Sequence, residues 1–371
     1  MNIGIAIFRL VPTGGLENDA IRIAAGLRAR GHRVTLYTSA GAEAAPAGVE
    51  VVRLNSSGAS NHAAMAAYSA QVDAAASGRH DLLVGFKKLQ GLDLLYCADW
   101  CYVEYHAWYE KLLPRYRSMA ALERACFAPD SKTRILLLSE PQRDAYVGAY
   151  HTPAERMSVL PPTVDRKHNL PAAPTAEERA LLRTQHGLST DSLVWLWVGL
   201  QPHVKGLDRV IPALARHPRA VLLICGASSG HRRVAALLAQ ARRHGIADRI
   251  RVLGTVTDEL KALYRLSDLL VHPARLDVTG TVILEAMAHG LPVITTAICG
   301  YSAHVSAADA GVVLPMPFDQ HAMERALAEA DPERRRRWSR NAFAYCDDPK
   351  FYSGIDRACD LIEIAGRQQT G

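Results

Sequence analysis

Aromatic residues make up only 6% of this 371-residue chain, and long apolar runs are absent. No apolar stretch approaches the roughly 18 residues that a membrane-spanning helix needs, so we expect no such span. The seven cysteines are odd in number and form no Cys-x-x-Cys pair, which excludes a disulfide framework and favours a reducing compartment. The composition, 49% hydrophobic and 22% charged, is that of a globular protein, and the length predicts two domains.

A strong charge of one sign is missing as well. The chain has 43 Lys and Arg against 37 Asp and Glu, a net charge of +6. This mild excess suits anionic small molecules, anionic lipid or nucleic acid alike. The densest basic block, 334–337, is too short for a nucleic-acid arm, so we expect no nucleic-acid partner. The chain opens on an apolar run typical of a buried strand rather than on a signal peptide, which predicts a cytoplasmic protein.

Common nucleotide and metal motifs are also absent. Gly14-Gly15 follows the first strand and opens a helix, but it lacks the third glycine of a dinucleotide fingerprint and the Gly-Lys-Ser/Thr of a Walker loop. A helix start with bare N–H groups can bind an anion, although a plain strand-to-helix turn explains the two glycines equally well. No His/Cys/Asp cluster has zinc spacing and no Asp-x-Asp pair occurs, so we expect neither a metal nor another cofactor.

Short apolar runs alternate with helices in both halves of the chain, which predicts an α/β protein of two Rossmann-like, doubly wound parallel-sheet domains. We expect domains at 1–165 and 166–345, followed by a C-terminal helix at 346–371 that crosses back to the first domain. Thr175 and Glu178 predict a capping box at the first helix of the second domain. The predicted strands lie at 2–8, 34–38, 51–54, 81–86, 135–138, 193–198, 220–225, 250–253, 269–272 and 293–296.

Two loops of the second half carry residues suited to a nucleotide sugar. Lys205 stands at a helix start beyond the carboxyl end of a strand, where a cation suits a diphosphate, and a solvated lysine is the less favoured alternative. Asp277 lies on a later loop, and Glu285 lies eight residues on, in the helix that begins near Thr281. Carboxylates accept hydrogen bonds from sugar hydroxyls, and free N–H groups at a helix start donate to phosphate. As a bare spacing, Asp-x7-Glu remains a weak signal.

The frame around this spacing, Gly-x-x-x-Leu-Glu-Ala-Met-Ala-x-Gly-x-Pro-Val, resembles the Glu-x7-Glu element of retaining glycosyltransferase family 4. The resemblance extends over nearly the whole chain, through Pro12-Thr13-Gly14-Gly15-Leu16, Leu160-Pro161-Pro162 and Cys299-Gly300-Tyr301, and is strongest to enzymes that glucosylate heptose in the lipopolysaccharide core. It implies the GT-B fold, with two domains facing across a cleft. It also implies retaining, metal-independent transfer of a hexose from a UDP-sugar, first of all UDP-glucose, to an inner-core heptose. The donor would lie on the second domain and the acceptor on the first.

The same resemblance implies roles for individual residues. Asp277 and Val204 stand where the family usually has glutamate and arginine, which leaves open UDP-hexosamine, UDP-galactose or another lipid-linked acceptor. His62 and Asp99 match acceptor positions, and a structural role explains each equally well. The implied catalytic residues are Lys205, Asp19 and Asp277. The implied donor-binding residues are Gly14, Gly15, Arg166, Lys205, Asp277, Thr279, Gly280, Thr281, Val282 and Glu285.

Residues 103–130 interleave aromatic and basic side chains. This mixture is typical of a segment that binds an anionic membrane surface, which a lipid-linked oligosaccharide acceptor would require. The alternative is an amphipathic helix packed on its own sheet. We therefore expect peripheral association with the cytoplasmic face of the inner membrane. The predicted membrane contacts are Trp108, Tyr109, Lys111, Arg115 and Arg117.

Other classes of protein remain as alternatives. Residues 226–230 fit the Gly-x-Ser-x-Gly elbow of a serine hydrolase, with Ser228 as nucleophile, but no Asp/His pair stands out as its partner. A nucleotide-sugar 2-epimerase shares the GT-B fold, and a catalytically silent sugar-binding protein would tolerate Val204 and Asp277. A nicotinamide dehydrogenase shares only the alternating pattern and lacks the fingerprint.

Overall fold

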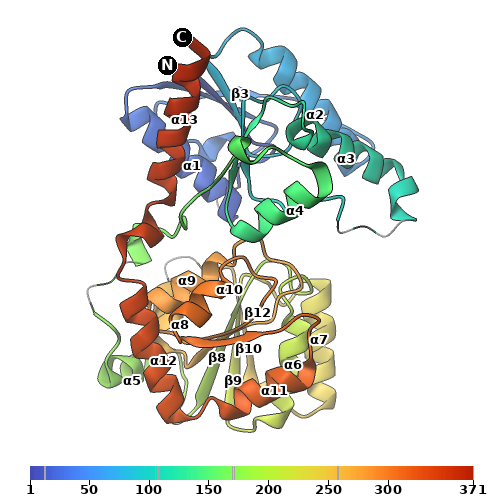
Figure 1. Cartoon of the computed structure of the whole chain (residues 1–371). Coiled ribbons are helices and arrows are strands. Elements are labelled where there is room, and N and C mark those ends of the chain that lie inside the picture. Colours follow the sequence, from blue (N-terminus) through green and yellow to red (C-terminus); the bar gives the residue numbers. More distant parts are fainter. Residues whose placement is uncertain are drawn as a thin grey trace. The chain divides into compact units, whose positions relative to one another are not determined.

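The computed structural model describes residues 1–11, 14–104, 106, 109–168, 170, 172–256 and 259–370. The chain divides into two compact units. Unit 1 comprises Met1–Thr163 and Ser353–Gly371, and unit 2 comprises Val164–Tyr352. Each contains one all-parallel sheet flanked by helices, so the predicted pair of doubly wound α/β sheets is confirmed (Figure 1).

Unit 1 contains seven strands in the order β3-β2-β1-β4-β5-β6-β7. The short strand β5, a buried Leu-Leu-Tyr-Cys run, was not among the predicted strands, because four apolar residues fit a strand or a buried helix equally well. The strands are β1 (Asn2–Ala6), β2 (Arg33–Thr38), β3 (Glu50–Arg53), β4 (Leu82–Gly85), β5 (Leu94–Cys97), β6 (Arg134–Leu137) and β7 (Met157–Val159). The helices are α1 (Gly15–Ala29), α2 (Asn61–Ala76), α3 (Pro114–Phe127), α4 (Glu140–Tyr150) and α13 (Gly354–Thr370).

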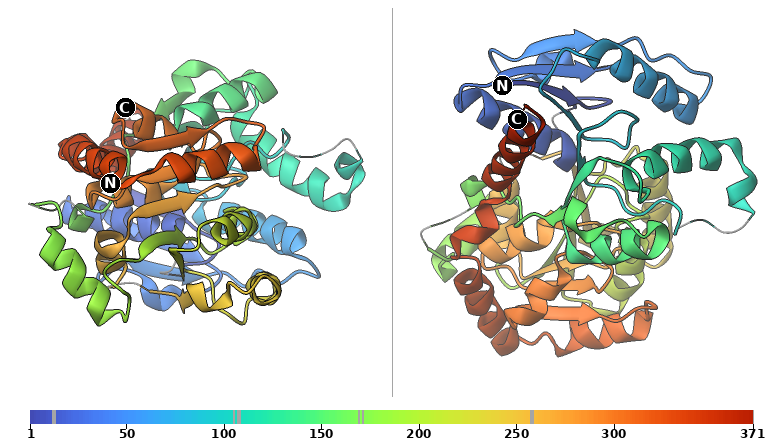
Figure 2. Two further views of the ribbon diagram at one scale, coloured as in Figure 1. Left: turned by 90° about the horizontal axis from the view of Figure 1, so that it is seen from below. Right: turned by 45° about the horizontal axis from the view of Figure 1, so that its top comes forward.

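The C-terminal helix α13 belongs to unit 1 and lies beside α1 (Figure 2). Arg30, at the end of α1, donates to Asp360 at 2.7 Å, and His32 contacts Glu363 at 2.7 Å. These polar contacts flank an apolar seam, in which Cys359 approaches Gly26. The last helix therefore completes one face of the first sheet.

Unit 2 contains six strands in the order β10-β9-β8-β11-β12-β13. The order reverses between β8 and β11, and such a switch point is where open α/β sheets bind ligands. The strands are β8 (Leu193–Val198), β9 (Ala220–Cys225), β10 (Ile250–Gly254), β11 (Leu269–His272), β12 (Val293–Thr296) and β13 (Gly311–Leu314). The helices are α5 (Ala176–Gln185), α6 (Leu207–Arg216), α7 (Arg232–Arg243), α8 (Leu260–Leu266), α9 (Thr281–Ala288), α10 (Ser302–Ala307), α11 (Gln320–Glu329) and α12 (Pro332–Tyr345).

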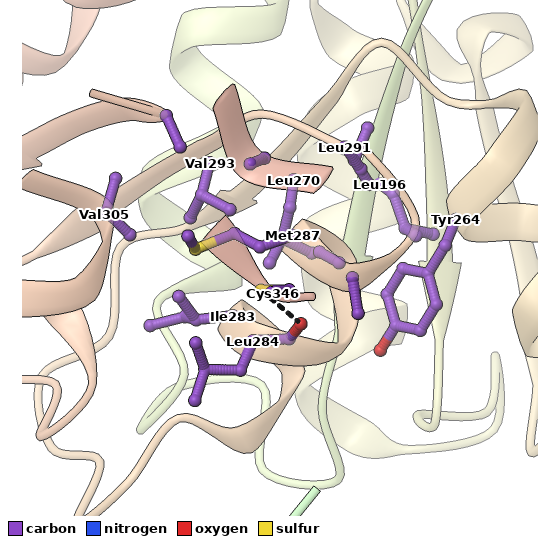
Figure 3. Close-up of a cluster of buried hydrophobic side chains, with 14 of the residues drawn as sticks. Leu196, Tyr264, Leu270, Ile283, Leu284, Met287, Leu291, Val293, Val305 and Cys346 are labelled. Atoms are coloured by element: carbon purple, nitrogen blue, oxygen red, sulfur yellow. Dashed lines mark hydrogen bonds between the residues drawn. The ribbon is translucent and has the colours of Figure 1, made fainter. Parts of the chain in front are cut away.

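Helix α9 is anchored in the core of unit 2. Its Leu284 and Met287 are fully buried in a hydrophobic cluster that also contains Leu270 of β11 and Val293 of β12 (Figure 3). Cys346 contributes a weak S–H contact to the Leu284 carbonyl at 3.9 Å. Burying each such apolar side chain stabilises the fold by roughly 1.5–3 kcal/mol, so the position of α9 is firmly held.

The predicted capping box of α5 forms only in part. Thr175 Oγ1 accepts a hydrogen bond from the Glu178 N–H at 3.1 Å, as expected. The Glu178 carboxylate instead binds Arg265 of α8 through two contacts of 2.6 Å. A bidentate ion pair outcompetes the reciprocal backbone bond.

Within the part of the chain that the structure describes, no helix combines the length and the apolar character required to cross a lipid bilayer.

Candidate functional site

Two loops meet at the switch point of unit 2. The first follows β8 and ends at Gly206, the N-cap of α6, and the second follows β11 and ends at Gly280, the N-cap of α9. Gly206 has φ +72°, and a Cβ there would lie 2.0 Å from the Pro273 carbonyl oxygen. Only glycine allows this left-handed turn to approach the second loop so closely.

Arg275 ties the two loops together, although the sequence had suggested no role for it. Its backbone N–H donates to the Val204 carbonyl at 2.7 Å, and its guanidinium makes two bonds of 2.7 Å to Asp208 in the first turn of α6. Because Asp208 neutralises it, Arg275 does not replace the arginine that the family usually has at position 204. Its contribution is to fix the Lys205 loop.

Lys205 points at Asp277 across these loops. Lys205 Nζ lies 2.8 Å from Asp277 Oδ2 and also donates to the Leu276 carbonyl at 3.3 Å. His272 Nε2 contacts the same Oδ2 atom at 2.8 Å, and the Gly280 N–H donates to Oδ1 at 2.9 Å. The Lys205 side chain remains 24% exposed, whereas His272 is buried, so this network ends in an accessible ammonium group.

The charges of this network follow from its surroundings. Burial alone would lower the pKa of His272, but its interactions with Asp277 and the neighbouring Cys299 sulfur raise that pKa to about 9. Burial would likewise raise the pKa of Asp277, yet the His272 hydrogen bond and the Lys205 charge hold it well below its usual range. Near neutral pH the group is therefore an imidazolium, a carboxylate and an ammonium, with one net positive charge.

Cys299 completes a cluster that sequence spacing did not reveal. One ligand atom each of His272, Asp277 and Cys299 lies within 4.8 Å of the others, an arrangement that could hold a metal ion. Cys299 reaches it because a single parallel bridge pairs it with Asp277. A structural zinc site needs four protein ligands, and this cluster offers three. A protonated His272 has no lone pair with which to bind a metal ion. The Asp277 carboxylate already binds the Lys205 ammonium. The residues fit an ion-pair network better than a metal site.

The start of α9 offers backbone donors beside this network. Gly280 has φ +73° and caps the helix without a side-chain hydrogen bond. The loop before it is held from the other side, because the Gly300 N–H donates to Asp277 O and the Tyr301 N–H to Thr279 O. Among the described residues, the N–H groups of Thr281 and Val282 have no hydrogen-bond acceptor. A helix start of this kind attracts phosphate oxygens.

Glu285, in the second turn of α9, is held by buried aromatic and imidazole groups that the sequence had not singled out. Tyr264 donates to Glu285 Oε2 at 2.8 Å, and His168 Nε2 lies 3.9 Å from Oε1. His168 Nδ1 contacts His289 Nε2 at 3.0 Å. Burial lowers the pKa of His168, and burial with repulsion from His168 lowers the pKa of His289 to about 3, so both rings are neutral near pH 7.

The glycine turn of unit 1 is less open to an anion than its sequence suggested. Gly14 caps α1 in an extended conformation without a side-chain bond, and the space beside Gly15 is open. However, a Cβ on Gly14 would lie 1.9 Å from Glu17 Oε2, so an acidic side chain already covers this helix start. Asp19 is buried and accepts from Tyr96 at 2.7 Å, with Arg22 at 3.6 Å.

The other predicted contacts lie in separate settings. Arg166 is an exposed residue of the short helix η4 (Arg166–His168) in unit 2. His62 Nδ1 lies 2.9 Å from Ser60 Oγ at the start of α2, whereas both oxygens of Asp99 lie 3.2 Å from Lys87 Nζ. The roles of Gly14, Gly15, Asp19, Arg166, His62 and Asp99 therefore stay predictions.

The predicted membrane segment includes the short helix η2 (Glu110–Leu112) and the start of α3. Tyr109, Leu112 and Leu113 are 60%, 73% and 54% exposed. Lys111, Arg115 and Arg117 are exposed beside them, and Trp108 lies outside the described residues. An exposed apolar cluster flanked by cations has the composition of an interfacial segment.

Comparison with known proteins identifies both halves of the chain. The model described as "Glycosyltransferase Family 4" matches residues 13–168, and that described as "Glycosyl transferases group 1" matches residues 178–345. The lipopolysaccharide glucosyltransferase WaaG of Escherichia coli (strain K12) is 33% identical over 375 residues, which cover 98% of each chain. A D-inositol 3-phosphate glycosyltransferase of Mycobacteroides abscessus is 30% identical over 189 residues, 50% of this chain and 42% of the relative.

Solved structures agree with this grouping. The crystal structure of WaaG, a glycosyltransferase involved in lipopolysaccharide biosynthesis, has a TM-score of 0.88 at 32% identity and covers 97% of this chain and 99% of its own. Anabaena HepE in complex with UDP-glucose has a TM-score of 0.76 at 19% identity, covering 98% and 100%, and so shares the fold. The predicted GT-B fold is confirmed.

Proposed function

The chain belongs to family 4 of the glycosyltransferases, and we propose that it transfers glucose from UDP-glucose to a heptose of the lipopolysaccharide inner core. Support comes from the 33% identity to the lipopolysaccharide glucosyltransferase over 98% of both chains. The observation that carries the chemistry is the Lys205 ammonium, which is held by Asp277 next to the start of α9.

In this proposal the donor binds along the two loops of unit 2. The Lys205 ammonium and the N–H groups of Thr281 and Val282 receive the diphosphate, with Thr279 and Gly280 forming the backbone next to it. Glu285 accepts hydrogen bonds from the ribose hydroxyls, because Tyr264 engages only one of its oxygens. Each group thus meets the part of a UDP-sugar that its charge and hydrogen-bonding capacity suit.

Asp277 acts through Lys205 in this scheme. Its Oδ2 atom already binds Lys205 and His272, and its Oδ1 atom accepts from Gly280. The aspartate side chain is one methylene shorter than the glutamate usual in the family, which suits a carboxylate held back among these partners. We therefore assign Asp277 the task of positioning the ammonium, and its contact with the sugar runs through water.

Transfer proceeds with retention and without a metal ion. The bond between the anomeric carbon and the β-phosphate oxygen breaks, and the acceptor oxygen forms its bond on the same face. The acceptor proton passes to the departing phosphate oxygen. Lys205 and the helix-start N–H groups stabilise the charge that develops there, in an arrangement fixed before the reaction begins.

A UDP-release assay tests the proposal. We expect turnover with UDP-glucose and a truncated lipopolysaccharide core, an α-configured product by NMR, and full activity in the presence of EDTA. Faster turnover with UDP-galactose or a UDP-hexosamine would assign another donor. Formation of an epimer without acceptor would make the protein an epimerase, and absence of UDP release with every donor would overturn the proposal.

We propose that the acceptor is lipid-linked and that the segment of unit 1 containing η2 and the start of α3 binds the cytoplasmic face of the inner membrane. Neutralising the basic side chains of this segment tests the proposal. Changing Lys111, Arg115 and Arg117 to Gln should weaken co-sedimentation of the protein with anionic vesicles. The matched control changes Arg336, Arg337 and Arg340 of α12 to Gln. Equal binding by the two triple variants would contradict membrane docking through this segment.

A further inference from the structure

A concave site lies within unit 1, whereas the loops assigned above to the donor belong to unit 2. It has a volume of about 880 Å³ and is lined by the segments that follow β1, β2 and β3 and by the first turn of α2. All three strands are parallel, so their carboxyl ends meet at this edge. Ligands of α/β proteins bind at such an edge, because loops and helix starts converge there.

The charged groups that line this pocket are both arginines. Arg9 follows β1 with its guanidinium 5.5 Å from the centre of the Phe8 ring, and Arg53 ends β3. Among the described residues, the lining contains no Asp or Glu. Arg53 contacts Glu43 at 3.7 Å, but the two side chains are 71% and 78% exposed, and such a surface pair is weak enough to give way to a ligand.

The uncharged groups of the pocket suit a sugar. Ser56 Oγ is buried and has no hydrogen-bond partner among the described residues, and the lining also includes Ser57, Asn55 and Asn61. A buried hydroxyl without a partner costs free energy that a polar ligand recovers. Phe8 provides an apolar surface at the same place. Cations, hydroxyls, amides and an aromatic ring together match a carbohydrate that carries negative charge.

We propose that this pocket binds an anionic sugar unit of the acceptor, one that carries a carboxylate or a phosphate group. The inference rests on the proposed glycosyl transfer and adds a residue-level site for the acceptor. The two guanidinium groups form charge-assisted hydrogen bonds to the anion, and the serine and asparagine side chains bind the sugar hydroxyls. His62 contributes through Ser60, whose Oγ it contacts while that atom caps α2.

Binding to the full-length protein tests the site without any turnover. Glucuronate, glucose 6-phosphate, inorganic phosphate and glucose are titrated into the wild type, an Arg9→Gln/Arg53→Gln variant and a control. The control, Arg33→Gln/Arg134→Gln, removes two exposed arginines of the same sheet. They are the first residues of β2 and β6, whereas the pocket lies at the carboxyl ends of strands. We expect the first double variant to weaken the binding of the charged sugars by tenfold or more, in line with charge-assisted bonds, and the control to leave it unchanged.

The titration also distinguishes the two sources of charge. Preference for glucuronate indicates a carboxylate ligand, and preference for glucose 6-phosphate indicates a phosphorylated one; both support the site. Inorganic phosphate bound as tightly as the sugar phosphate would overturn a carbohydrate site, as would equal weakening by both double variants.

A transfer assay links the pocket to the acceptor. We expect the Arg9→Gln/Arg53→Gln variant to raise KM for an acidic core acceptor about tenfold while kcat and the KM for the donor stay unchanged. Esterification of the acceptor's acidic groups should abolish the difference from the wild type. Normal KM in the variant would overturn the acceptor role and leave the glycosyl transfer standing. Sugar binding without any transfer would overturn the proposed function alone.

Discussion

Unit 1 and unit 2 share the order of six strands around a common switch point, and unit 1 adds a seventh strand, β7. Their buried ion-pair networks differ in whether they reach the surface. In unit 1, Lys88 is paired with Glu123, whose side chain is 0% exposed. Glu123 also accepts from the N–H groups of Tyr102 and Val103 and from the Tyr150 hydroxyl, so all partners are internal. In unit 2, the chain of contacts from His272 through Asp277 stops at the partly exposed Lys205.

The difference separates two uses of a buried carboxylate. Burial disfavours the charged form of Lys88, but Glu123 outweighs it and the pKa of Lys88 is raised, so the pair remains ionic. A closed pair of this kind fixes the chain at 102–103, just before the exposed basic segment. The open network instead ends in the partly exposed Lys205 ammonium, which can also bind an anion from outside the protein. We expect the closed network to control stability and the exposed Lys205 end of the open network to control turnover.

Breaking the closed network should have the largest effect. Glu123→Ala removes the carboxylate that contacts the Lys88 ammonium, and we expect a loss of roughly 3–5 kcal/mol of unfolding free energy. Hydrogen exchange of the β5 and β6 amides in unit 1 measures it. The Lys88→Met/Glu123→Leu double variant should recover much of this stability. An unchanged exchange rate in Glu123→Ala would show that the pair does not anchor unit 1.

Removing the Lys205 side chain, the exposed end of the network in unit 2, should affect catalysis rather than stability. Lys205→Ala is expected to lower kcat by about 10²–10³-fold, the usual effect of losing one electrostatic donor to the transition state. Unfolding should change little, because the side chain is partly exposed. Lys167→Ala, an exposed lysine of unit 2 paired with Asp165, is the control. Near-normal turnover in Lys205→Ala would remove this residue from the mechanism.

His272, the buried end of the open network, should make the unfolding free energy of unit 2 decrease at alkaline pH. The pKa of His272 is about 9 in the folded protein and 6.5 ordinarily, so its stabilisation is fully present below about pH 6.5 and is lost as the pH rises through 9. The change is on the order of 2–3 kcal/mol, since one pKa unit corresponds to about 1.4 kcal/mol. Unfolding of the wild type at pH 6 and pH 9 measures it, and His272→Gln should remove the difference. An equal slope in both proteins would contradict the assignment.

The smallest expected effect concerns the ribose contact. Tyr264→Phe removes the hydroxyl that holds Glu285, and we expect the KM for the donor to rise about three- to tenfold with little change in kcat. Tyr352→Phe is a matched control in the same unit, because that hydroxyl binds the Cys346 carbonyl and not Glu285. Equal KM values for the two variants would show that Tyr264 does not position Glu285.

Much of the fold and part of the site followed from local sequence. Alternating apolar runs and helices predicted two parallel sheets, because strands buried on both faces need apolar residues throughout. Lys205 and Asp277 could be expected on neighbouring loops, since both follow strands of one parallel sheet. The strands β5, β7 and β13 were missed, because a run of three or four residues does not by its own periodicity separate strand from helix.

The partners of these residues depend on contacts between segments that lie far apart in the chain. The sequence around Asp277 does not predict that Cys299 lies beside it or that its carboxylate binds both Lys205 and His272. It also does not predict the ion pair between Arg275 and Asp208. Glu17 covers Gly14 because of the way its side chain folds back over the helix start. Residue type and periodicity fix which segments are buried and which loops share a sheet edge, because backbone hydrogen bonding and apolar burial are repetitive. The direction of each side chain and its choice of ionic partner arise only when the packed elements meet, because charge pairing acts through space and not along the chain.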